Sequence, residues 1–170
     1  MRRATVSEVC FFLSLPLREV VAFVCNFLSV ARYVFDLAFE HVIKVAVVSH
    51  PSLLVIPDDL KASRLLQKNW LMKLIVSALL FFLSKQTYAS TVKAPLLINS
   101  CEVDSRFPKE AQKTADEILG GGKFAPGYKR EYFEGCTHGF AVRGDLSDPK
   151  VKAGKEGSFK AAAEWFLKYL

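Results

Sequence analysis

Residues 92–108 read Val-Lys-Ala-Pro-Leu-Leu-Ile-Asn-Ser-Cys-Glu-Val-Asp-Ser-Arg-Phe-Pro, and this stretch decides the fold class. Its first part, residues 94–100, predicts a strand. Pro108 then opens a helix that Gly120 ends. A strand joined to a helix in this way predicts an α/β architecture with a mostly parallel sheet.

Further elements continue the alternation on both sides of this stretch. Upstream, residues 31–40 show helical spacing, and residues 43–49 (Ile-Lys-Val-Ala-Val-Val-Ser) predict an interior strand of a parallel sheet. A helix start is predicted at Pro57. Downstream, we predict a strand over 128–133, a long loop over 135–148 and a last helix. The inner face of that helix is predicted from the apolar residues at helical spacing, which are Phe159, Ala162, Ala163, Phe166 and Leu170.

The composition is that of a globular protein with no sign of a nucleic-acid or metal partner. Hydrophobic residues make up 51% and charged residues 24% of the 170 positions. The net charge is +6, but the basic residues over 109–117 are interspersed with acids, which indicates a solvated surface and not a nucleic-acid site. The four cysteines show no CxxC pair, so we predict neither a metal site nor a disulfide framework. We expect no cofactor. We also expect the protein to be in a reducing, cytoplasmic compartment.

Two apolar segments do not follow the α/β pattern. Residues 1–30 are rich in Phe, Leu and Val, and residues of about 63–91 add an apolar insertion where an α/β unit normally needs only a short connection. Within the insertion, Leu74 to Leu83 is an uninterrupted apolar run. It is shorter than the roughly 18–20 residues that a spanning helix needs, so a buried or interfacial position is favoured over a transmembrane one.

An acid and a base follow two of the predicted strands. Asp104 comes after the strand of residues 94–100, and His138 comes after the strand of residues 128–133. In an open α/β sheet the reacting groups lie at the carboxyl ends of strands, where the loops converge. A carboxylate that orients an imidazole, which in turn deprotonates a nucleophile, is the logic of a catalytic triad. We therefore predict Asp104 and His138 as catalytic residues.

These residues also carry a resemblance to a known family. The runs Val92–Ile98, Glu102–Asp104, Tyr132–Gly135 and His138–Asp145 resemble the dienelactone hydrolase family of α/β-hydrolases, especially its fungal members, and residues 31–60 resemble it more weakly. The resemblance implies a partial α/β-hydrolase fold that lacks N-terminal strands. It also implies a hydrolase of small-molecule esters or lactones, with Asp104 and His138 at the triad acid and base.

The nucleophile that the resemblance implies is missing. Family members carry it, usually as Cys, in a Gly-x-Cys-x-Gly turn directly before the helix that matches residues 31–40. Here residues 23–30 contain no glycine, and Cys25 is wrongly spaced, so we do not predict it as the nucleophile. The family's oxyanion-hole loop is unmatched as well. Family members also hold an acidic substrate with arginine, which implies a substrate-binding role for Arg143.

Two further hypotheses remain beside the active hydrolase. One is a catalytically inactive remnant, or a truncated or mis-spliced product, because the segments 1–30 and 63–91 abut matching sequence abruptly. The other is a membrane-associated protein that uses Leu74 to Leu83. Among the remaining candidates, we interpret His50 as a structural loop residue and His41 as a helix-end residue. Cys101 and Cys136 are interpreted as small buried residues.

Overall fold

The computed structural model describes residues 12–15, 19–25, 30–52, 54, 56, 60 and 88–170. The apolar run Leu74 to Leu83 and most of the predicted insertion lie outside these ranges, as does the helix start predicted at Pro57. Among these residues, side chains are described from Val34 onward except for Ala89, so residues before Val34 contribute backbone positions only.

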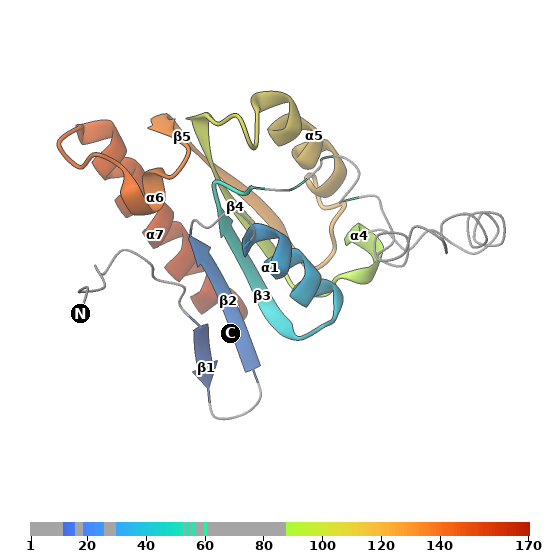
Figure 1. The fold of residues 1–170 in the computed structure, drawn as a ribbon. Helices are drawn as coiled ribbons and strands as arrows, with labels where there is room; N and C mark the ends of the chain where they lie inside the picture. The colour runs from blue at the N-terminus through green and yellow to red at the C-terminus, as the bar shows by residue number, and fades with distance from the viewer. Residues whose placement is uncertain are drawn as a thin grey trace, which may run out of the picture.

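The described chain is organised around a five-stranded sheet in the order β1-β2-β3-β4-β5 (Figure 1). Strands β2 to β5 run parallel to one another, and β1 pairs antiparallel with β2 at the edge. The mostly parallel α/β architecture predicted from the sequence is confirmed. The strand bounds are β1 Phe12–Leu15, β2 Glu19–Cys25, β3 Ile43–Ser49, β4 Leu96–Val103 and β5 Tyr128–Thr137.

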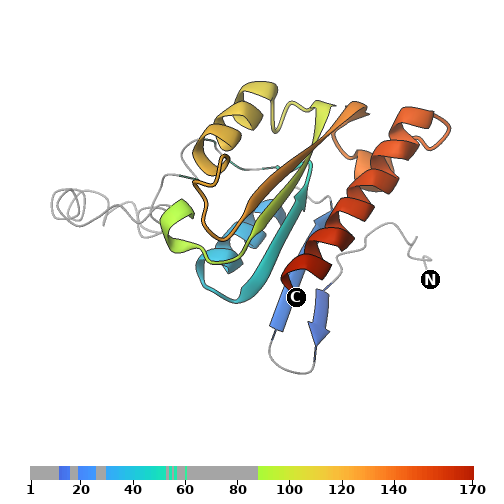
Figure 2. The same ribbon diagram turned by 180° about the vertical axis from the view of Figure 1, so that it is seen from behind.

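Helices cover both faces of this sheet. Figures 1 and 2 show α1 and α5 on one face and α7 on the opposite face. Because α1 and α5 each follow a strand and return to the start of the next one, the chain makes βαβ crossovers. The helix bounds are α1 Val30–Phe39, α4 Tyr88–Thr91, α5 Lys109–Leu119, α6 Phe140–Arg143 and α7 Pro149–Tyr169.

Alternating side chains of the inner strands form a separate core on each face. In β3, Ala46 and Val48 pack toward α1, whereas Val45 and Val47 pack toward α7. This period of two, with apolar residues at all four positions of 45–48, is expected of a strand covered on both sides. The middle of the described sheet, β3 and most of β4, is therefore buried, and the loops that follow these strands can carry function.

Strands β1 and β2 lie inside the N-terminal segment 1–30. The backbone of β2 pairs in parallel with β3, with Cys25 opposite Ser49 at the end of the ladder. Residues from this segment thus extend the sheet next to β3. The boundary that we place at residue 30, and the insertion at about 63–91, stay predictions.

The ends of β4 and β5 differ from the sequence prediction. Both strands run further than expected, because a bulge lets β5 continue past Gly135 and pair at Thr137 with Val103. Gly135 has φ +71°, and its N–H donates to the Glu102 carboxylate at 2.9 Å. The prediction of a loop over 135–148 was therefore wrong for 135–137 and for α6: a glycine that indicated a strand end instead forms a bulge.

The inner face of α7 was predicted correctly only in part: Ala162 is buried and Phe166 packs against the core, as expected. Phe159 is 69% exposed and Leu170 is 52% exposed, so neither packs against the sheet. Small residues let the helix approach closely: a Cβ at Gly154 would overlap the Cys136 sulfur. Hydrophobicity alone did not reveal this face, whose buried residues are Val151, Gly154, Ser158, Ala162 and Trp165.

A charged network ties α5 to β5. The Arg130 guanidinium donates to both oxygens of Asp116 at 2.6–3.0 Å, and the Tyr128 hydroxyl donates to the same carboxylate at 2.8 Å. Burial alone would raise the pKa of Asp116, but the bonds from Arg130 and Tyr128 outweigh it and lower the pKa. The network fixes α5 over the strands whose far ends carry Asp104 and His138.

Tyr88, which lies in the core, differs from Tyr128 in how its hydroxyl is bonded. Its ring packs between Phe35 and Phe124, with centroid distances of 4.7 and 5.7 Å, and the residue is fully buried. The Tyr88 hydroxyl has no hydrogen-bond partner among the residues that the structure describes. A buried hydroxyl without a partner loses the hydrogen bonds that it makes to water in the unfolded chain.

The two tyrosines give a matched prediction about stability. Removing the hydroxyl in Tyr88→Phe is expected to raise the free energy of unfolding by about 1 kcal/mol, since an unsatisfied polar group leaves the core. Tyr128→Phe is expected to lower it by about 1–2 kcal/mol, because Asp116 loses a donor. Urea unfolding of both variants against the wild-type chain measures the difference. Equal effects of the same sign would contradict this account.

Within the described ranges, each helix is either too short or too polar to span a bilayer.

Candidate active site

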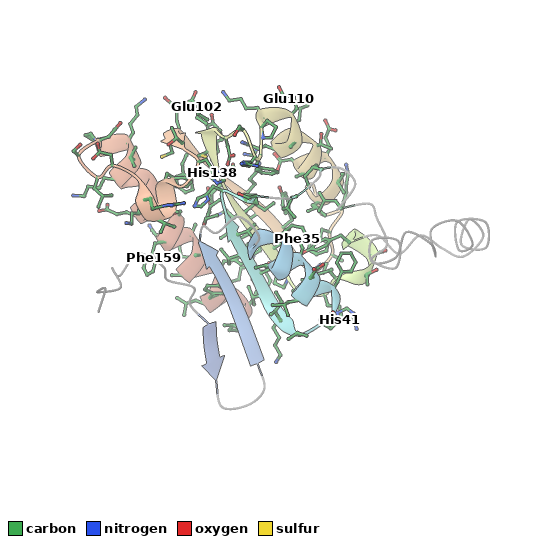
Figure 3. The ribbon with its side chains drawn as sticks, in the orientation of Figure 1. Phe35, His41, Glu102, Glu110, His138 and Phe159 are labelled. Atoms are coloured by element: carbon green, nitrogen blue, oxygen red, sulfur yellow. The ribbon has the colours of Figure 1, made fainter. Side chains whose placement is uncertain are left out.

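Three loops meet at the carboxyl edge of the parallel strands. Strand β3 is followed by His50-Pro51-Ser52, β4 by Asp104, and β5 by His138. Because β3, β4 and β5 are adjacent and parallel, the residues that follow them lie at one edge. Figure 3 shows His138 at this upper edge and His41 at the opposite end of the sheet.

Asp104 is held as a buried carboxylate. Its side chain is 1% exposed, and its Oδ1 accepts hydrogen bonds from the backbone N–H groups of Arg106 at 2.8 Å and Phe107 at 3.1 Å. Burial alone would raise the pKa of Asp104. The hydrogen bonds from His138 and from the Arg106 backbone outweigh that effect and hold the pKa below its usual value, so the group is ionised at neutral pH.

His138 faces this carboxylate directly. Its Nδ1 lies 2.9 Å from both oxygens of Asp104. An ionised carboxylate only accepts hydrogen bonds, so Nδ1 must carry the proton, and the neutral imidazole keeps its lone pair on Nε2. The backbone N–H of His138 also donates to Val103 at 3.0 Å, which joins the end of β4 to the loop after β5. The structure thus brings together the two residues that the sequence predicts as acid and base.

Ser52 is the third member of this cluster, and the sequence reasoning missed it. Its Oγ lies 3.2 Å from Nε2 of His138. Because Nε2 is the acceptor in the neutral ring, the Ser52 hydroxyl is the donor of this bond. The signal that could have found Ser52 is its position, since it follows a buried strand next to the one that precedes Asp104.

His50 lies buried beside His138 and is only 2% exposed. The two rings are 4.9 Å apart, and the His50 ring also lies 5.8 Å from Phe140. Desolvation, with a smaller contribution from repulsion by His138, lowers the pKa of His50 to about 4. His50 is therefore neutral at pH 7, and neither ring nitrogen has a hydrogen-bond partner among the described residues.

The cysteines within the described side chains are poor nucleophiles. Cys101 and Cys136 are both buried, as predicted. Burial, followed by repulsion from Asp104, raises the pKa of Cys101 to about 12, and burial also raises the pKa of Cys136. Both thiols stay protonated, whereas only a thiolate attacks a carbonyl. The backbone of Cys25 ends β2 beside Ser49, but its side chain lies outside the described atoms.

Arg143 and His41 occupy different places relative to this edge. Arg143 is exposed at the end of α6, and its charge is close enough to His50 to contribute to the lowering of that pKa. His41 is exposed in the turn after α1, with φ +54°. Arg143 thus belongs to the surroundings of His138, and His41 does not.

A hollow of about 380 Å³ lies elsewhere, at the start of β5. It is bordered by Tyr128, Trp165 and Tyr169, among others. Since Tyr128 begins β5 and His138 follows its end, the hollow is at the opposite end of that strand and is not part of the cluster. Within the residues that the structure describes, no group of His, Cys, Asp or Glu side chains could hold a metal ion.

Comparisons with known proteins agree with the geometry. A family model described as "Dienelactone hydrolase family" matches residues 70–170. The chain belongs to this family. The family match includes both Asp104 and His138, and it starts within the segment that we predict as an insertion.

Three curated fungal proteins resemble the dienelactone hydrolase chain over part of its length. "Hydrolase tropI" of Talaromyces stipitatus is 35% identical over 79 residues, which is 46% of this chain and 30% of that protein. "Hydrolase pyvD" of Aspergillus violaceofuscus is 34% identical over 79 residues, covering 46% and 31%. "Dienlactone hydrolase 2" of Gibberella moniliformis is 33% identical over 73 residues, covering 43% and 30%. The chain thus spans about a third of the length of these relatives. No solved structure matches it significantly.

The Asp104 carboxylate predicts a pH dependence of stability. A carboxyl group whose pKa is lower in the folded than in the unfolded chain stabilises the fold above the unfolded value, about 3.9 for Asp, and this contribution disappears as the pH falls through the folded pKa. We expect Asp104→Asn to lower the free energy of unfolding by about 1–3 kcal/mol at pH 7. The difference in free energy of unfolding between this variant and the wild-type chain should become smaller below about pH 4.

Denaturant unfolding from about pH 7 to pH 3 on both proteins measures this difference. A difference that stays constant across the whole range would show that Asp104 is not held ionised by its hydrogen bonds.

Proposed function

We propose that the chain hydrolyses ester or lactone bonds of a small molecule, with His138 as general base and Asp104 as the acid that orients it. The observation that carries this proposal is the 2.9 Å contact between Nδ1 of His138 and the buried Asp104 carboxylate. It leaves Nε2 as a proton acceptor at the edge of the sheet where family members react.

The chemistry follows from the protonation states. As a nucleophile attacks the ester carbonyl, its proton passes to Nε2 of His138, and the imidazolium that forms is stabilised by the Asp104 carboxylate. The same Nε2–H then protonates the leaving alkoxide. A water molecule, deprotonated in the same way, releases the acid. His138 is 30% exposed in its side chain, so a substrate can approach it from solvent.

Arg143 supports a preference for acidic substrates. It is a cation on the surface at the end of α6, near His50 and therefore near His138. Arginine binds carboxylates with two parallel hydrogen bonds, so it suits the recognition of a substrate carboxylate. The name of one relative, "Dienlactone hydrolase 2", refers to a lactone substrate for that protein and supports the same substrate class here.

An inactive remnant is the competing proposal. It is favoured by residues 23–30, which contain no glycine where the family places its nucleophile turn. A chain without any nucleophile keeps at most a weak residual rate, because the members of a triad act as a unit. Activity that depends on His138 therefore separates the two proposals.

Hydrolysis of p-nitrophenyl acetate by the purified chain tests the proposal. His138→Ala is expected to lower kcat/KM by about 10³-fold, since the base is lost, and Asp104→Asn by about 10²–10⁴-fold, since the imidazole loses its orientation. His41→Asn is a matched control: it removes an exposed imidazole at the other end of the sheet, and Asn tolerates the positive φ at this position.

The control variant is expected to retain the wild-type rate. A wild-type rate equal to that of His138→Ala would establish the inactive remnant.

A further inference from the structure

The hydroxyl of Ser52 lies where a nucleophile would be needed. It is 3.2 Å from Nε2 of His138, whose other nitrogen is bound to Asp104. This is the order of contacts in a catalytic triad: hydroxyl to imidazole, and imidazole to carboxylate. Along the chain the order is Ser52, Asp104, His138, which is the order nucleophile, acid, base found in α/β-hydrolases.

The loop that carries Ser52 is anchored tightly to the sheet. At the end of β3, the His50 N–H donates to the Asn99 carbonyl at 2.7 Å, and the Asn99 side chain donates to Ser49 Oγ at 3.1 Å. Asn99 is fully buried in β4, the strand that leads to Asp104. The backbone before Ser52 is therefore held in register with the backbone before the acid.

The chain then turns through a strained conformation. His50 has φ +39°, which L-residues rarely adopt, and Pro51 restricts the next step. Backbone strain of this kind persists only where the surroundings enforce it, and it concentrates at functional sites. In this case the turn brings the Ser52 side chain next to His138. Ser52 is 7% exposed there.

We propose that Ser52 is the nucleophile of this chain, in place of the Cys turn that residues 23–30 lack. The inference rests on the proposed hydrolase function. Ser52 Oγ bonds to the ester carbonyl carbon while its proton moves to Nε2 of His138 and the carbonyl electron pair moves to oxygen. When the intermediate collapses, the bond to the alkoxide breaks and the alkoxide takes the proton from Nε2. Water then cleaves the Ser52 ester through the same base.

The small exposure of Ser52 defines the acyl group. A substrate must bring its carbonyl carbon to a side chain that is almost covered, so a short acyl group such as acetyl fits better than a long one. The leaving group, in contrast, lies on the side of His138, which is more open. The substrate class is therefore an ester or lactone with little bulk around the carbonyl.

The test uses the full chain, p-nitrophenyl acetate and a fluorophosphonate probe. The probe phosphonylates an activated serine with loss of fluoride, and peptide mass spectrometry locates the adduct. We expect the adduct on Ser52 and a loss of kcat/KM by at least about 10²-fold in Ser52→Ala. Ser147→Ala is the matched control, because Ser147 is exposed and bonded to Asp145. It should keep both the wild-type rate and the label.

Ser52→Cys covers the case in which Ser52→Ala does not fold. We expect iodoacetamide to alkylate position 52 of this variant, at a rate that falls at least about tenfold when His138→Ala is added, because the base generates the thiolate. An alkylation rate that does not fall when His138→Ala is added would overturn the inference.

Two further results separate the inference from the function that it rests on. Wild-type turnover that needs His138 but survives Ser52→Ala, or that is lost in Cys25→Ala with the label absent from Ser52, would overturn the inference and leave the proposed hydrolase intact. A wild-type chain that neither turns over the ester nor reacts with the probe would overturn both.

Discussion

The contact between the buried Asp104 carboxylate and Nδ1 of His138 is the interaction on which the site depends. A carboxylate this deeply buried is tolerable only if every charge-bearing oxygen is bonded, and two backbone N–H groups and the imidazole supply those bonds. The same bonds fix the tautomer of His138. The proton-accepting nitrogen, and with it the chemistry, follows from how Asp104 is buried.

The rest of the fold serves to keep the ends of β4 and β5 together. The bulge at Gly135 lets both strands run on until the N–H of His138 reaches the carbonyl of Val103. From one face, the bonds of Arg130 to Asp116 hold α5 against β5. From the other, the close approach of α7 at Gly154 supports the strand that carries Cys136. The loop of Ser52 is held by the hydrogen bonds of His50 and Ser49 to Asn99 in β4.

Sequence reasoning predicted the parts of this arrangement that have a local signal. The apolar run of residues 43–49 predicts β3 with its observed bounds, and the positions of Asp104 and His138 after predicted strands are enough to expect them together. The resemblance to dienelactone hydrolases is confirmed by the family match. The catalytic roles of the two residues stay a prediction.

The missed features depend on contacts between distant segments. In the sequence Gly135 indicates a strand end, but its N–H donates to Glu102 and the residue forms a bulge. The inner face of α7 depends on the space available between the helix and the sheet, and hydrophobicity alone does not predict it. The only sequence signal of Ser52 is its position after a predicted strand, because its contact with His138 joins residues 86 positions apart. The family pattern places a nucleophile in the region of Cys25, not in the loop after the neighbouring strand β3.

The proton on Nδ1 of His138, which the Asp104 carboxylate holds in place, can be observed by NMR. The chain has three histidines, so nitrogen-15 NMR of the imidazoles, assigned with His41→Asn and His50→Asn, isolates the His138 signals. In the neutral ring we expect a proton on Nδ1, a hydrogen-bonded but unprotonated Nε2, and loss of this pattern in Asp104→Asn. A His138 ring that carries its proton on Nε2, with Nδ1 free, would contradict it.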